Sequence, residues 1–209
     1  MEYQDYMDRA YLKGLAKQKI KGKIGILFVI AVLIAAISSI AAGLLSIIPV
    51  AGPIISVIVI TPAFALSIMR VYLNVVADQE LKITDAFSGF DDFWAAFKVQ
   101  FLTGLFTFLW SLLFIIPGII KAYSYSMSMY ILAENKGMPA LECIQQSKDM
   151  TDGHKMELFI LYLSFFGWAL LGAITFGIAY IWIMPYIQAT QANAYNVLKA
   201  KYHGQIPTN

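Results

Sequence analysis

The sequence has very little of the chemistry that catalytic and metal sites use. It holds one cysteine, Cys143, and two histidines, His154 and His203. A single cysteine excludes an intramolecular disulfide, and so small a set argues against a zinc site built from cysteine and histidine. The 209 residues contain no phosphate-binding glycine loop, nucleophile elbow or zinc-protease helix motif. We therefore predict no catalytic residues, no metal and no cofactor, and expect a protein that is not an enzyme.

Charge is also scarce. Charged residues make up 13% of the chain and hydrophobic residues 59%, whereas ordinary soluble domains have about 25% and 45 to 50%. Several apolar runs long enough to span a bilayer follow one another. The composition predicts an all-α polytopic membrane helix bundle that forms a single membrane domain over residues 1–209. The basic residues border apolar runs and form no aromatic-interleaved surface, so we expect no nucleic-acid partner.

The pattern predicts about six transmembrane helices, arranged as three hairpins that are each preceded by an amphipathic interfacial helix. The hairpins are expected to turn at residues 49–53, 117–118 and 175–177, which are short, uncharged and contain glycine or proline. The unit is thus repeated three times in the chain. The predicted segments are a basic amphipathic helix (1–23), hairpin 1 (24–77), an interfacial helix (84–97), hairpin 2 (98–133), an interfacial helix (138–152), hairpin 3 (156–198) and a tail (199–209).

The positions of lysine and arginine predict the orientation. Thirteen of the 15 lie in or beside segments 1–23, 78–98, 134–155 and 199–209, which the positive-inside rule places in the cytoplasm together with both termini. The exceptions are Arg70 and Lys121; Lys121 comes just after a predicted outer turn, and both could snorkel. In the N-terminal helix Met7, Tyr11 and Leu15 share a face, so we expect it to lie on the bilayer and meet anionic inner-leaflet lipids.

Polar residues within spans point to a candidate pocket, because a polar side chain in lipid needs a partner. We predict that the pocket lies between the second, fourth and sixth spans. The simpler alternative is that these groups only link neighbouring helices, at about 0.6 kcal/mol per hydrogen bond. Pro62 and Pro185 are predicted to kink their helices near mid-bilayer. The candidate pocket residues are Tyr125, Ser128, Tyr130, Gln188, Gln191, Asn193 and Tyr195.

Several segments carry a resemblance to a known family. They are residues 117–121 (PGIIK), 130–135 (YILAEN), 153–155 (GHK), 163–168 (LSFFGW) and 182–186 (WIMPY). The chain resembles the bacterial integral membrane proteins catalogued as domain of unknown function 975. The resemblance covers nearly the whole chain and implies a multi-pass protein of the bacterial plasma membrane. It implies no activity, because none is assigned to that family.

Three functions stay open at this point. The first is a non-enzymatic accessory, assembly or immunity-type membrane component that binds a membrane protein or a second copy of itself. The second is a small permease or lipid-handling protein that uses the polar pocket. The third and weakest is an intramembrane enzyme centred on His154, since residues 151–157 form the only cluster of histidine, carboxylates and amine.

Overall fold

The computed structural model describes residues 7–48, 58 and 60–205. Within them all regular secondary structure is helical, which confirms the predicted all-α class. The predicted turn at residues 49–53 and the start of the second span lie outside the described residues. The helices are α1 (Arg9–Ile20), α2 (Ile24–Leu45), α4 (Thr61–Val76), α5 (Phe93–Leu113), α6 (Ile115–Tyr125), α7 (Ser128–Glu134), α8 (Ala140–Thr151), α9 (Lys155–Leu163), α10 (Phe166–Ile174) and α11 (Tyr180–Tyr202), with the 3₁₀ helices η2 (Ile83–Phe87) and η3 (Phe90–Asp92) before α5.

Helices α2, α5, α9 and α10, which we call the outer helices, expose most of their apolar side chains. Three stretches of the described chain are long and apolar enough to cross a membrane, namely Ile24–Leu45, Ile83–Leu113 and Lys155–Ile174, and these contain the outer helices. Helix α5 buries only Ala96 and Val99. So large an exposed apolar surface is typical of a helix that meets lipid or a partner.

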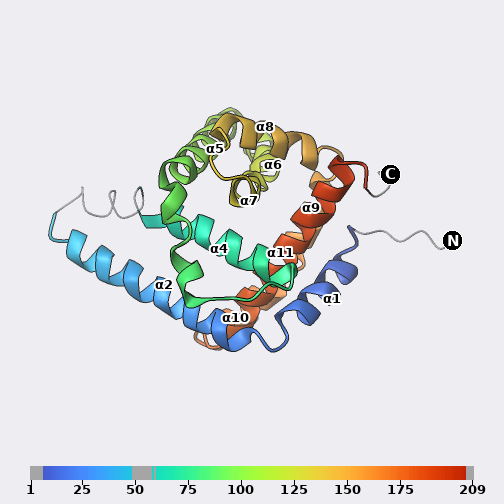
Figure 1. Ribbon diagram of the computed structural model, residues 1–209. Coiled ribbons are helices and arrows are strands. Elements are labelled where there is room, and N and C mark those ends of the chain that lie inside the picture. The colour runs from blue at the N-terminus through green and yellow to red at the C-terminus, as the bar shows by residue number, and fades with distance from the viewer. Residues whose placement is uncertain (1–6, 49–57, 59, 206–209) are drawn as a thin grey trace.

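Helices α4, α7 and α11, which we call the inner helices, form the centre of the molecule (Figure 1). Helix α4 contacts both α7 and α11. The largest fully buried side chains lie mainly on these three helices, and the inner helices also carry buried polar residues. These buried side chains include Leu66, Val71, Val75, Tyr130, Ile131, Leu132, Tyr195 and Leu198.

The N-terminal helix α1 packs lengthwise on α11 (Figure 1). The Asp8 carboxylate caps it by accepting hydrogen bonds from the backbone N–H groups of Ala10 and Tyr11. Its buried residues are Leu12, Ala16 and Ile20, which are spaced by four and so lie on one face. That face meets protein. It is offset by one residue from the predicted face of Met7, Tyr11 and Leu15, of which Met7 is also buried.

The predicted interfacial helix at 84–97 consists of η2, η3 and the first residues of α5. This connection folds back along α4, where the Phe64 ring touches those of Phe87 and Phe90. The Gly89 N–H donates to Ser67 Oγ at 2.8 Å. A Cβ at Gly89 would lie 2.0 Å from the Ala63 carbonyl oxygen, so only glycine allows this approach.

The predicted interfacial helix at 138–152 is α8, but one of its faces is buried against α5, α6, α7 and α11. The Ser147 hydroxyl donates to the Ser124 carbonyl at 2.8 Å and accepts from the Met127 N–H at 3.2 Å. These bonds satisfy backbone groups where α6 ends and α7 begins. Helix α8 therefore stabilises the break between those two helices.

The turn expected at residues 117–118 lies earlier, at Phe114, the one residue between α5 and α6. Phe114 is extended, with φ −158° and ψ 145°. Pro117 falls in the first turn of α6, where a missing N–H costs no helical hydrogen bond. Gly118 lets the helices approach, because a Cβ there would lie 2.1 Å from Ser111 Oγ. The third turn, between α10 and α11, contains Phe176 and Gly177, which have φ values of 50° and 90°.

Candidate functional site

Four buried side-chain atoms in the described part of the chain have no hydrogen-bond partner: Ser128 Oγ, Tyr130 Oη, Gln188 Oε1 and Asn193 Nδ2. All four belong to residues that the sequence marked as candidates. A buried polar atom without a partner is costly, so each one needs a structural or functional explanation.

Tyr130 and Tyr195 join two of the inner helices. Their rings stack with centroids 5.3 Å apart and planes 18° apart. The Tyr195 hydroxyl donates to Glu134 Oε2 at 2.8 Å, and Lys199 Nζ lies 2.5 Å from the same oxygen. These contacts hold α7 in register with α11, so this pair has a structural role.

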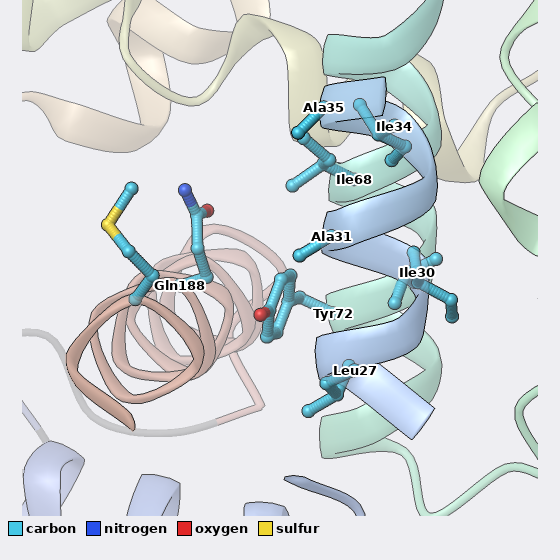
Figure 2. A pocket seen from close by; sticks show the side chains of 10 residues that line it. Leu27, Ile30, Ala31, Ile34, Ala35, Ile68, Tyr72 and Gln188 are labelled. Atoms are coloured by element: carbon cyan, nitrogen blue, oxygen red, sulfur yellow. The ribbon is translucent and has the colours of Figure 1, made fainter. Parts of the chain in front are cut away.

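An apolar cavity of about 230 Å³ lies between α2, α4 and α11 (Figure 2). The buried wall includes Leu27, Ile30 and Tyr72, whereas Ala31 and Ala35 at the rim are exposed. The rim therefore opens on the apolar surface of α2. The cavity is lined by Leu27, Ile30, Ala31, Ile34, Ala35, Ile68, Val71, Tyr72, Met184 and Gln188.

The polar groups of this cavity come from Gln188 and Tyr72. Figure 2 shows the Gln188 side chain projecting from α11 and the Tyr72 phenol pointing from α4 toward that helix. Gln188 Oε1 is one of the unpartnered atoms. Apolar walls with a few convergent polar groups are typical of sites for small molecules, although this cavity is smaller than the roughly 300 to 1,000 Å³ of most of them. It would hold one end of an apolar chain.

The structure separates the predicted pocket residues. Of the seven candidates only Gln188 lines the cavity, which lies beside α2 and not beside the fourth span. Tyr125 is buried next to Phe106, with ring centroids 6.2 Å apart. Gln191 is half-buried one turn further along α11. Helical periodicity placed Gln188 and Gln191 on one face but could not say which helix that face meets.

The two predicted kinks also differ. Pro62 lies in the first turn of α4, which begins directly after the π-helical Ile60, so it marks the junction between the two kinds of helix and not the interior of α4. Pro185 lies inside α11. There its ring removes the hydrogen bond that the Ile181 carbonyl would otherwise accept.

Arg70 is a buried residue whose role the sequence did not reveal. Its guanidinium donates to the Asp92 carboxylate, to the Ser88 carbonyl and, at 3.3 Å, to the Ala133 carbonyl. The predicted snorkelling toward the membrane boundary is therefore replaced by an ion pair within the protein. Arg70 fastens the connection before α5 to α4 and α7.

In the residues that the structure describes, the fold is all-helical and three apolar stretches could each cross a membrane. The chain belongs to the family described as "Protein of unknown function (DUF975)", which it matches over residues 7–124 and 113–202. This confirms the family resemblance seen in the sequence. No curated protein and no solved structure matches the chain.

Proposed function

We propose that this chain is a non-catalytic, multi-pass protein of the bacterial plasma membrane that binds one end of a lipid-like amphiphile between α2, α4 and α11. The observation that carries the proposal is the unpartnered Gln188 carbonyl in the wall of the apolar cavity. A ligand with a hydroxyl or amide N–H on an apolar chain would satisfy that oxygen and fill the space around it. Solute transport fits less well, because the walls are almost wholly apolar.

The contacts around His154 fit a structural role at the start of α9. His154 Nδ1 lies 2.8 Å from Glu157 Oε2 at the start of α9, and Lys155 pairs with Asp152 at 3.0 Å. These are contacts between residues three apart in the sequence, typical of a helix N-terminus. Among the described residues no group of three or more histidine, cysteine, aspartate and glutamate side chains could hold a metal ion.

The test is to extract the full chain with its lipids and identify the retained amphiphile by mass spectrometry. Gln188→Leu and the cavity-filling Ala31→Leu should each reduce retention. Gln191→Leu is the matched control, since this glutamine lies on the same helix outside the cavity. Equal retention by all three variants would refute the site.

For the topology, we propose that three hairpins enter the bilayer from the cytoplasmic side and that both termini are cytoplasmic. The sequence pattern alone predicts six crossings. The structure favours a second hairpin that turns back inside the bilayer without crossing it, because Lys121, which was expected near an outer turn, lines the same hollow as Lys148 and Lys155 of the predicted cytoplasmic connection.

Two cysteine variants test this topology. In sealed vesicles with the outer face outward, Gly137→Cys should react with a membrane-impermeant maleimide only after the vesicles are opened. Labelling of Ile116→Cys from outside intact cells would restore six crossings.

A second candidate is an accessory role in which α2 packs against a helix of a partner membrane protein or of a second copy. Ala31, Ala35, Ser39 and Gly43 are spaced by four and are all exposed. Small residues at this spacing let membrane helices approach closely. Crosslinking in native membranes should capture a partner through α2, and Ser39→Leu with Gly43→Leu should abolish that product. Crosslinks unchanged by these substitutions would exclude α2 as the contact.

A further inference from the structure

A second hollow, separate from the apolar cavity, lies between α6, α8 and the start of α9. Its volume is about 470 Å³, and it shares no residue with the cavity beside α2. Three lysines from three different elements border it, whereas the apolar cavity has none. The lining residues are Lys121, Ser124, Gln145, Lys148, Asp149, Asp152 and Lys155.

The positive charge of this hollow is incompletely neutralised. Lys155 pairs with Asp152 at 3.0 Å, but Lys148 Nζ donates to a neutral group, Gln145 Oε1, at 2.9 Å. Lys121 Nζ lies over the Trp110 ring, 4.8 Å from its centroid. Neither Lys121 nor Lys148 forms an ion pair with any described carboxylate. Three lysines against two aspartates leave a formal charge of +1.

Several lysines in or just after α1, by contrast, have partners within the protein. Lys19 and Lys23 both pair with Asp78. Lys13 Nζ donates to the Ser164 carbonyl at 3.2 Å and lies 4.2 Å from the Phe165 ring centroid. Part of the positive charge that the sequence assigned to anionic lipid is therefore engaged within the protein.

Exposed apolar residues adjoin two lysines of the hollow in the sequence. Ile119 and Ile120 follow the turn into α6 beside Lys121, and Met156 and Phe159 follow Lys155 on α9. A molecule bound there would meet ammonium groups at one end and hydrocarbon at the other. Anionic phospholipids have this arrangement, and lysine ammonium groups bind phosphate as point charges.

We propose that the hollow between α6 and α8 binds the phosphate of an anionic phospholipid headgroup through Lys121 and Lys148, with the acyl chains along Ile120 and Phe159. Asp149 and Asp152 face the same space and oppose the phosphate. They should keep the affinity moderate, and removing their charge should therefore strengthen binding.

The experiment is a titration of the full-length detergent-solubilised protein with phosphatidylglycerol, followed by native mass spectrometry. Phosphatidylcholine and glycerol phosphate serve as comparison ligands. Lys121→Gln/Lys148→Gln should weaken phosphatidylglycerol binding by roughly tenfold. The matched double variant Lys98→Gln/Lys136→Gln, which removes equal charge from exposed positions outside the hollow, should bind like the wild type.

A second variant should change the affinity in the opposite direction. Asp149→Asn/Asp152→Asn should bind phosphatidylglycerol more tightly than the wild type, which a misfolded protein would not do. Equal binding by the two lysine double variants would overturn the proposal. Displacement of the phospholipid by an equal concentration of glycerol phosphate would overturn the assignment to lipid and leave a site for a free phosphate monoester. None of these results depends on the amphiphile site beside α2.

Discussion

The outer and inner helices differ in what surrounds them. Helix α5 leaves Phe101, Phe108 and Leu112 more than half exposed. Helix α7, which follows α6 in the chain, buries five of its seven residues, including Ser128 and Tyr130. The outer helices present apolar side chains outward, as helices in lipid do, whereas the inner helices are surrounded by protein and carry buried polar groups.

This difference explains where the molecule keeps its polar groups. Arg70, Ser128 and Asn193 lie on inner helices, and all are buried. Arg70 has its hydrogen-bond partners there, while Ser128 Oγ and Asn193 Nδ2 have none among the described residues and are open to a ligand. The cavity with Gln188 lies where an outer helix, α2, meets two inner ones.

The largest difference in stability between an inner and an outer helix should follow the replacement of a charged residue. Arg70→Met strands the carboxylate of Asp92 in a largely buried site, and breaking such a pair costs about 3 to 5 kcal/mol. Lys98→Met on the exposed face of α5 is the control and should leave stability nearly unchanged. Denaturant titration in detergent measures both. Similar losses for the two variants would mean that α4 is no more enclosed by protein than α5.

The same truncation in the two classes of helix gives the next largest contrast. Leu132 on α7 is fully buried and Leu112 on α5 is 72% exposed. Leu132→Ala should lower the free energy of unfolding by about 2 to 5 kcal/mol, and Leu112→Ala by about 0.5 kcal/mol or less. Thermal unfolding of the two variants side by side would reveal a cost at Leu112 if α5 were packed by protein.

Two substitutions of Glu134, at the end of α7, distinguish the contribution of its ion pair from that of its hydrogen bond. Glu134→Gln keeps an acceptor for the Tyr195 hydroxyl and loses only the Lys199 ion pair, which is partly exposed, so we expect a loss of about 1 kcal/mol or less. Glu134→Leu also leaves the hydroxyl unpaired, which should add about 1 to 3 kcal/mol. Equal losses in an unfolding titration would argue against the Tyr195 hydrogen bond.

The smallest effect concerns the link between α1 and the end of α4. The hydrogen bond from Lys19 lowers the pKa of Asp78 below its usual range. A carboxyl whose pKa is lower in the folded state stabilises the fold above its unfolded pKa of about 4 and loses that contribution as the pH falls through the folded value. The Tm of the wild type should therefore fall more than that of Asp78→Asn on acidification. Parallel curves would show that the pair contributes nothing.

Much of the helical content follows from the sequence, because long apolar runs in α2 and α5 leave few alternatives. Which helices pack against one another does not follow from the sequence. The period of α1 indicates an apolar face but not that α11 covers it. Residues 84–97 have helical spacing, yet η2 and η3 form there because Gly89 must approach Ala63. Gln188 was a candidate from its residue type and from its place on one face of the sixth span. Its cavity depends on α2 as well, and no periodicity encodes the distance between α2 and α11.

The difference between outer and inner helices can be tested most directly by labelling. The full-length protein in lipid vesicles is treated with a lipid-soluble carbene reagent, and the labelled peptides are then mapped. The structure predicts labels along α2, α5, α9 and α10, at positions such as Val32, Phe108 and Phe166, and almost none on α4 and α7. Equal labelling of α4 or α7 and α5 would contradict the division into lipid-solvated and protein-solvated helices.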